Sequence, residues 1–354
     1  MRTLARIPPL LQDLADAQEG LLSAQQCERH GVGASRRSRL VAAGRWSAVT
    51  RGVVDTVAVP PTARVAADAP GRVVVPLAAQ RVPHLFAWPP ESPGDVLHGH
   101  LRRRHAWIGL LAYGPEAIAV GGDALALHGV EGLPTWHRTG TALPAASRRP
   151  GRPGVPLRQF DDGMTTVEFG DRRTGQRRIA SAEWALAQAV PELSMGDGLA
   201  VLDSALRLGA VDRRGLARSH DHARGRRGVA LRHELWELAS PLAASPLESR
   251  GRWQCIAEGV PPDALQLPVH NRAGRLLAVG DMAWRLRDGW LVTEMDGHAW
   301  HDDRPGGVRR DRDRDNALAA VGVRLLHFGA GHVAREAVGT TVRTALTAAR
   351  RTGS

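Results

Sequence analysis

The sequence predicts a mixed α/β (α+β) fold that is built from more than one domain. Two observations lead to this expectation. The chain has 354 residues, which is more than one hydrophobic core usually organises. Its two ends also carry different patterns of apolar residues. The first sixty residues have the spacing of short helices followed by a hairpin, whereas the last hundred alternate between strand and helix patterns.

Two apolar segments near the C-terminus predict a β-hairpin. Leu276–Leu286 and Trp290–Asp296 both have strand character, and Asp288-Gly289 between them is a typical two-residue turn. Apolar residues fall on both faces of this hairpin, so we expect it to be a covered, central part of a sheet. One face is predicted to carry Met282, Trp284, Leu286, Leu291 and Met295.

The other face of the hairpin gathers carboxylates. With a two-residue turn, Asp281 lies opposite Asp296 and Ala283 lies opposite Glu294, so all three acidic side chains share one face. Carboxylate oxygens are the ligands that Mg²⁺ prefers, and buried carboxylates need a partner. The pattern therefore predicts a site for a hard divalent cation. The alternative is that the acids line a solvated face of the sheet.

A helix is expected after the hairpin, over Val308–Val321, and it ends at Gly322. Asp311, Arg314 and Leu318 fall on one stripe of this helix, so two charges point the same way as apolar residues. Arg314 is therefore a candidate for bracing a carboxylate or a phosphate, with Asp311 orienting it. A simple ion pair within the helix is the alternative. The remaining expected elements are a strand over Val323–Phe328 and a closing helix over His332–Arg350.

These residues resemble a known group of nucleases. The string consists of Asp281, Glu294, Asp296, Gly297, His301, Asp311, Arg314, Asp315 and Leu318. In this order it resembles the uncharacterised family related to very-short-patch-repair endonucleases, which belongs to the PD-(D/E)-x-K superfamily. The resemblance spans about residues 245–335. It implies a restriction-endonuclease-like mixed sheet flanked by helices and a Mg²⁺ (or Mn²⁺) cofactor.

The resemblance also implies a role for each matching residue. Asp281 would be the principal metal ligand, and Glu294 and Asp296 would occupy the E-x-K positions. Glu248 would support the site from the first core helix. His301 would contact water or phosphate.

One departure from the family pattern concerns proton transfer. Asp296 stands where the superfamily has lysine, and the whole chain contains no lysine. A lysine-assisted mechanism is therefore excluded. His301 could move a proton instead, because an imidazole titrates near neutral pH. The alternative is that His301 is an ordinary surface residue of a loop.

The charge of the chain favours a nucleic-acid partner. The chain contains 47 basic and 36 acidic residues, which gives a formal charge of +11. Such a surface attracts phosphate backbones. Every one of these cations is arginine, which a G+C-rich genome would also explain.

The N-terminal sixty residues predict a helix-turn-helix followed by a wing. The expected elements are helices over Leu10–Gln18, Ser23–Gly31 and Ser35–Ala43 and a hairpin over Arg45–Val54. The third helix presents Arg36, Arg37 and Arg39, as a recognition helix does in a major groove. This part resembles the winged-helix domain of abortive-infection type IV (AbiEi-like) antitoxins. The alternative is a small module for protein binding or dimerisation.

The expected domains are a winged helix-turn-helix over 1–59, a linker over 60–75, an AbiEi-like middle domain over 76–240 and the endonuclease-like domain over 245–354. In the middle domain, helices are expected over Val96–Ala112 and Pro115–Leu127, and the string 124–129 resembles the body of the same antitoxin family. Cys27 and Cys255 are expected in hydrophobic cores, because they lie far apart and lack metal-ligand spacing. No signal peptide or membrane span is expected, which predicts a cytoplasmic protein.

The expected function is a Mg²⁺-dependent DNA endonuclease whose N-terminal domain binds DNA. The first alternative is a DNA-binding antitoxin-type regulator with an inactive nuclease-like domain. The second is a structural or protein-interaction module. DNA is the expected partner, together with a second copy of the chain or a toxin.

Overall fold

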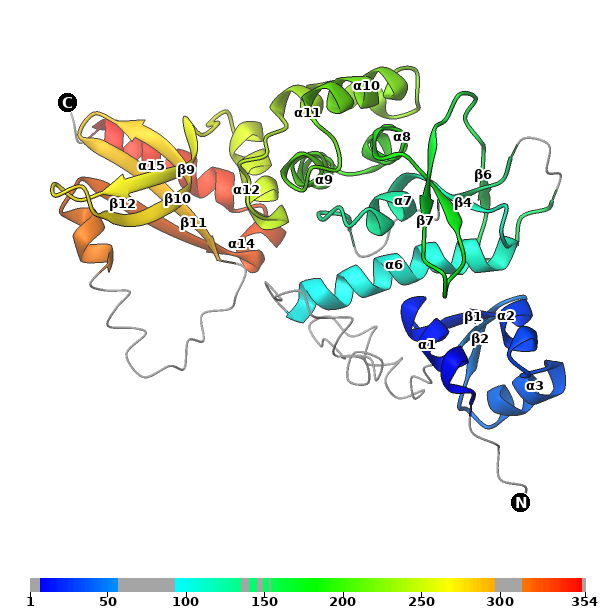
Figure 1. The fold of residues 1–354 in the computed structure, drawn as a ribbon. Helices are drawn as coiled ribbons and strands as arrows, with labels where there is room; N and C mark the ends of the chain where they lie inside the picture. Colours follow the sequence, from blue (N-terminus) through cyan, green and yellow to red (C-terminus); the bar gives the residue numbers. More distant parts are fainter. Residues whose placement is uncertain are drawn as a thin grey trace. The chain divides into compact units, whose positions relative to one another are not determined.

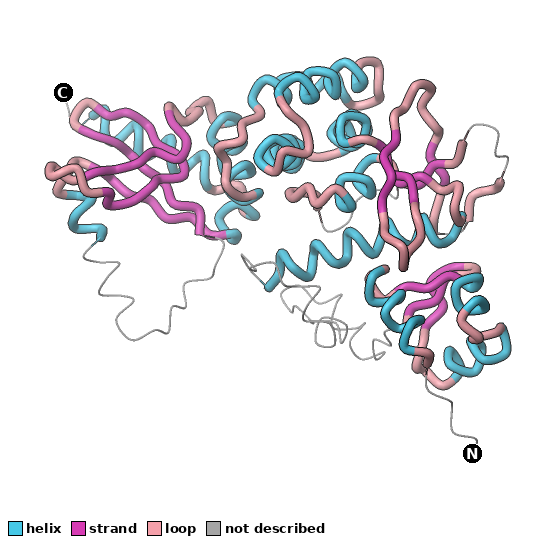
Figure 2. The backbone as a smooth tube through the Cα atoms, in the orientation of Figure 1, coloured by secondary structure: helices cyan, strands magenta, loops and turns pink. Residues whose placement is uncertain are grey.

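The computed structural model describes residues 7–56, 93–134, 140–144, 149–152, 154–296 and 314–351. It is a mixed α+β structure, as the sequence predicts (Figures 1 and 2). The chain divides into two compact units, which are residues 1–129 with 135–188, and residues 130–134 with 189–354. Within the described residues, no helix has the length and apolar character needed to cross a membrane.

The first unit begins with the expected helices and hairpin. Its elements are α1 (Pro9–Ala17), β1 (Leu21–Ser23), α2 (Ala24–Arg29), α3 (Ala34–Ala42), β2 (Ser47–Thr50) and β3 (Val53–Asp55). Ser23 and Gln26 form the predicted capping box at the start of α2. The strand β1 was not predicted; it pairs with β3 and completes a three-stranded sheet in the order β1-β3-β2. Cys27 lies in the hydrophobic core of this module, as expected.

The first unit continues with a second, larger sheet. Its elements are α6 (Pro93–Tyr113), β4 (Ile118–Ala119), α7 (Gly121–Leu127), β5 (Thr141–Ala142), β6 (Leu157–Arg158), β7 (Thr166–Phe169), β8 (Arg177–Ala180) and α8 (Ala182–Ala189). The prediction of one helix over Pro115–Leu127 is wrong in its first half. Ile118 and Ala119 pair with strands on both sides, and Gly121, at φ +55°, opens the helix that follows.

Ion pairs hold the N-terminal module on α6. Glu19 contacts His100 and Arg103, and Asp55 contacts Arg104. Glu19 and Asp55 are buried, so these contacts are part of a packed interface. The predicted linker over 60–75 lies outside the described residues.

The second unit begins with helices that belong with the C-terminal sheet. They are η2 (Val190–Glu192), α9 (Met195–Arg207), α10 (Arg213–Ala223), η3 (Val229–Leu231), α11 (His233–Leu238) and α12 (Pro246–Ala257). Helices α9 and α12 pack on each other, joined by a buried ion pair between Asp203 and Arg252. This grouping differs from the expected division, which placed residues up to 240 in the middle domain.

The C-terminal sheet is the mixed sheet that was expected. Its strands are β9 (Ala264–His270), β10 (Leu276–Leu286), β11 (Gly289–Asp296) and β12 (Val323–Gly329), in the order β12-β11-β10-β9. Strands β9, β10 and β11 are antiparallel, and β12 runs parallel to β11.

Apolar clusters cover both faces of this sheet. One cluster contains the side chains predicted for the first face of the hairpin, packed with Cys255 and residues of α14 (Ala330–Ala334) and α15 (Val338–Arg351). The other contains Ala283, Val292 and Leu318. The closing helix that was expected over His332–Arg350 is divided into α14 and α15, with Glu336 between them at φ +55°.

The register of the hairpin differs from the predicted one by two residues. Leu286 pairs with Gly289, so the loop is Arg287-Asp288 rather than Asp288-Gly289. Gly289 has φ +142°, and a Cβ there would lie 1.9 Å from the carbonyl oxygen of Gly322. The approach of the residue that precedes β12, which the hairpin sequence cannot reveal, therefore selects this turn.

Candidate metal centre

The site lies where the regular alternation of side chains along β9 is interrupted. Leu265 and Leu267 would share one face of a regular strand, but Leu265 packs with one apolar cluster and Leu267 with the other. Gln266 between them has φ +50°. Its neighbour on β10 is Asp281, because the pairs on either side are Gly280 with Leu267 and Met282 with Leu265. Irregularities of this kind re-aim side chains next to active sites.

Asp281 is held by one backbone and one side-chain donor. Its Oδ2 accepts a hydrogen bond of 2.6 Å from the backbone N–H of Met295, and its Oδ1 accepts one of 3.3 Å from Nε2 of Gln266. Burial, together with the negative charges of Glu248 and Glu294, raises the pKa of Asp281 to about 7. Among the described residues, burial and like charges favour the protonated form of this carboxyl group.

Glu248 reaches the same place from the first turn of α12. Its Oε2 accepts hydrogen bonds of 2.9 Å from the backbone of Ala244 and from Nε2 of Gln266, and its Oε1 accepts one from Ser245 Oγ. Gln266 thus bridges Glu248 and Asp281. Burial raises the pKa of Glu248 in spite of these hydrogen bonds. The structure thus places Glu248 next to Asp281, and the supporting role that the resemblance implies for it stays a prediction.

Glu294 and Asp296 lie beside a histidine of the neighbouring strand. His327 Nδ1 is 3.6 Å from Glu294 Oε2 and 3.4 Å from Asp296 Oδ2. Ligand atoms of these three side chains all lie within 4.8 Å of one another. Arg314 contacts both carboxylate oxygens of Glu294. It therefore braces a carboxylate, which is one of the two roles that the sequence suggested.

The structure brings most of the predicted residues together, but not as one ligand set. Extending the observed register by one residue places Asp281 opposite Glu294 rather than Asp296. Among the described residues, the group with ligand atoms in mutual reach contains Glu294 and Asp296 with His327, and Asp281 is not a member. The predicted residues His301 and Asp311 lie outside the described part of the chain.

Sequence reasoning missed Gln266 and His327. Each is the polar residue between two apolar neighbours in a strand, which is the only signal that could have drawn attention to it. The parallel pairing of β12 with β11 brings His327 next to Glu294.

The raised pKa of Asp281 predicts a pH-dependent stability. Between the ordinary pKa of 3.8 and about 7, the folded protein binds a proton that the unfolded chain has lost. In chelator, the free energy of unfolding should therefore fall as the pH rises from 5 to 8. Asp281→Asn should remove roughly 2–3 kcal/mol of this fall, because the slope of about 1.4 kcal/mol per pH unit applies from pH 5 to about 7. Urea unfolding of both proteins at several pH values measures it, and parallel curves for the two proteins would contradict it.

The three arginines predicted to bind DNA have different surroundings. Arg37 donates hydrogen bonds to the backbone carbonyls of Ala24 and Val32 and pairs with Glu28. Its guanidinium therefore joins α2 to α3 within the module. Arg39 is exposed on α3, so it is better placed for a phosphate contact than Arg37.

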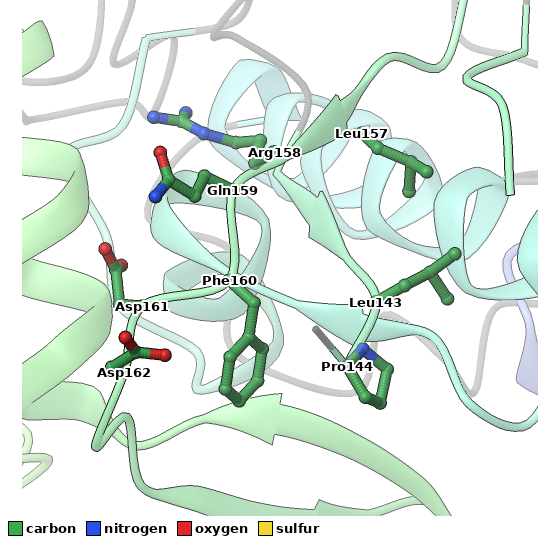
Figure 3. Close-up of a pocket in the computed structure, with 8 residues that line it drawn as sticks. All are labelled: Leu143, Pro144, Leu157, Arg158, Gln159, Phe160, Asp161 and Asp162. Carbon is green, nitrogen blue, oxygen red and sulfur yellow. The ribbon is translucent and has the colours of Figure 1, made fainter. Parts of the chain in front are cut away.

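A pocket of about 430 Å³ lies in the first unit, beside β6 (Figure 3). It is lined by Leu143, Pro144, Leu157, Arg158, Gln159, Phe160, Asp161 and Asp162. Asp161 accepts a hydrogen bond of 2.7 Å from Gln188 Nε2. None of the residues predicted for metal or DNA binding lines this pocket.

Two proteins of Mycobacterium tuberculosis are similar to this chain. They are the uncharacterized proteins Rv2248 of strain H37Rv and MT2308 of strain CDC 1551 / Oshkosh, each 31% identical over 186 residues. The match covers 52% of this chain and 67% of each relative. No family model matches the chain. At this identity and coverage, the chain belongs to the same family as these two mycobacterial proteins.

Proposed function

We propose that this chain is a divalent-cation-dependent endonuclease that hydrolyses phosphodiester bonds of DNA, with the N-terminal winged helix binding the duplex. One observation carries the proposal. Four carboxylates from α12, β10 and β11 lie in two neighbouring groups: Glu248 and Asp281 are bridged by Gln266, and Glu294 and Asp296 lie beside His327. Burial raises the pKa of Asp281 and of Glu248. Arg314 balances the charge of Glu294 only. Such an arrangement suits a bound cation.

The carboxylates suit the proposed cofactor. Glu294 and Asp296, whose ligand atoms lie within 4.8 Å of each other, would hold Mg²⁺ or Mn²⁺, and Asp281 on the adjacent strand would be the third carboxylate ligand that the nuclease resemblance implies. The ion would polarise the phosphate and lower the pKa of the attacking water. Gln266 of β9 donates to the Asp281 carboxylate and also to Glu248 of α12. Because the chain has no lysine, proton transfer must use other groups.

The binding role of the N-terminal module rests on charge and geometry. The formal charge of the whole chain is +11, which favours binding to phosphate backbones. Within the module, α3 follows the turn after α2, as a recognition helix does.

A second function is favoured by one contact. Both oxygens of Glu294 meet Arg314, so an internal cation already neutralises one carboxylate of the centre. In a DNA-binding regulator of the antitoxin type, with an inactive nuclease-like domain, the ion pair between Arg314 and Glu294 would serve only to stabilise the fold.

A cleavage assay separates these functions. Supercoiled plasmid and mismatched duplex DNA are incubated with the full chain and Mg²⁺, Mn²⁺ or EDTA. The endonuclease should nick or linearise the DNA with either cation and leave it intact in EDTA. Tight duplex binding without cleavage under all three conditions would favour the regulator.

The DNA-binding role predicts a change in salt dependence. Replacing Arg36 and Arg39 together by alanine should weaken duplex binding, and each lost phosphate contact should reduce the log–log salt slope by about 0.9. Fluorescence anisotropy at several salt concentrations measures this. The matched control replaces Arg172 and Arg173, which are exposed in the same unit. An equal loss of DNA affinity in both variants would mean that only net charge matters. Unchanged affinity in the Arg36 and Arg39 variant would favour a protein-binding role for the module.

A further inference from the structure

His327 lies beside the two carboxylates through the parallel pairing of β11 and β12. Glu294 is the register partner of His327, and Asp296 is the partner of Gly329. Register partners on adjacent strands point to the same face of a sheet. The imidazole Nδ1 lies 3.6 Å from Glu294 Oε2 and 3.4 Å from Asp296 Oδ2. Backbone pairing therefore fixes the arrangement, so that it does not depend on a mobile loop.

The three side chains are half-buried, and they combine one nitrogen donor with two carboxylates. Their donor atoms all lie within 4.8 Å of one another. Small rotations of the side chains could direct all three at a single ion with metal–ligand distances near 2.1 Å. This set differs from a cluster of carboxylates, because it includes an imidazole nitrogen, which is not a preferred ligand of Mg²⁺.

Arg314 leaves room for such an ion. A carboxylate has about four lone-pair positions, and Arg314 uses one Nη atom to reach both oxygens of Glu294. His327 approaches Oε2 of the same carboxylate. Glu294 can therefore keep its contact with Arg314 and still offer an oxygen to a cation.

We infer that His327 is the nitrogen ligand of a cation held by Glu294 and Asp296, and that the centre therefore selects a divalent transition-metal ion such as Mn²⁺ over Mg²⁺. Mg²⁺ takes oxygen ligands almost exclusively, whereas an imidazole nitrogen suits transition metals. The inference rests on the proposed function, because it assigns the ion of the same centre. It adds a ligand that the nuclease resemblance does not supply.

The test compares His327→Asn with wild type by calorimetric titration of the full chain, using Mn²⁺ and Mg²⁺ separately. The variant should bind Mn²⁺ at least about tenfold more weakly, because even the outer partners of a ligand contribute roughly ten- to a hundredfold. The Mg²⁺ affinity should change by less than about threefold, since the asparagine keeps an oxygen donor. His270→Asn is the matched control, because His270 is an exposed histidine on β9 of the same sheet. It should bind both ions like wild type.

Pulsed electron paramagnetic resonance of bound Mn²⁺ gives a second readout. The coupling of a directly bound ¹⁴N nucleus should be present in wild type and His270→Asn, and absent in His327→Asn. Circular dichroism and thermal unfolding establish that the variants are folded. Wild type without Mn²⁺ binding, or a variant with unchanged affinity and an unchanged ¹⁴N coupling, would overturn the inference.

Cleavage assays keep this inference distinct from the proposed function. Selective Mn²⁺ binding through His327 without any cleavage would support the metal site and reject the endonuclease. Cleavage together with unchanged Mn²⁺ selectivity in His327→Asn would support the endonuclease and reject the role of His327.

Discussion

Asp281→Asn is expected to abolish cation-dependent DNA cleavage, with a loss on the order of a thousandfold or more. The carboxylate lies between Glu248 and Glu294, where it is held by Met295 N–H and Gln266. Asparagine keeps the shape of the side chain but removes the charge that would attract a cation. Losing one charged metal ligand costs several kcal/mol of transition-state stabilisation, and each 1.4 kcal/mol is a factor of about ten in rate.

The comparison needs a control from the same hairpin. Asp288→Asn is suitable because Asp288 is exposed in the β10–β11 turn, where asparagine is equally acceptable. This variant should cleave plasmid DNA at the rate of wild type. Asp281→Asn should remain folded and, in chelator at pH 8, should be more stable than wild type, because the neutral amide removes a buried like-charge conflict. Loss of activity together with a gain in stability could not be explained by misfolding. A stable Asp281→Asn protein with full activity would reject the site.

The hairpin shows how much of the site could be predicted from sequence. Alternation of apolar residues identified both strands, and β10 begins and ends at the predicted residues, Leu276 and Leu286. The turn was misplaced by one position, which shifts the register by two residues. Side chains alternate with a period of two, so this error changed the partner of Asp281 but left Glu294 and Asp296 on one face.

Other parts of the site depend on contacts that local sequence does not encode. The positive φ of Gln266 turns Leu265 and Leu267 to opposite faces, and no residue type in that strand predicts it. His327 is brought in by a parallel pairing, which needs a crossover connection.

The N-terminal module illustrates the same limit. The capping box at Ser23 and Gln26 was correctly predicted, because it is a local pattern. In contrast, the bonds of Arg37 to the carbonyls of Ala24 and Val32 depend on how two helices pack. The sequence groups Arg37 with Arg36 and Arg39 as candidate DNA ligands, and it does not predict that Arg37 joins the two helices.

Helix α12, which carries Glu248, is held in place by a buried ion pair. Arg252 Nη2 lies 2.9 Å from both carboxylate oxygens of Asp203 on α9. Asp203 also accepts hydrogen bonds from Ser249 Oγ and Ser240 N–H. Asp203 is 1% exposed and Arg252 is 6% exposed. A pair this deeply buried costs much desolvation, and removing one partner leaves the other charge unbalanced.

Asp203→Ala should therefore lower the free energy of unfolding by about 3–5 kcal/mol, which urea denaturation measures. The double replacement Asp203→Leu with Arg252→Met should recover a large part of this loss, because it leaves no buried charge, although Ser240 N–H still lacks its acceptor. The control is the exposed ion pair of Arg224 with Asp221, where Asp221→Ala should cost less than about 1 kcal/mol. A cost of Asp203→Ala as small as that of the control would mean that α9 and α12 are held by apolar packing alone. A double replacement as unstable as the single one would show that the hydrogen bonds of Asp203, rather than its charge, fasten α12 and position Glu248.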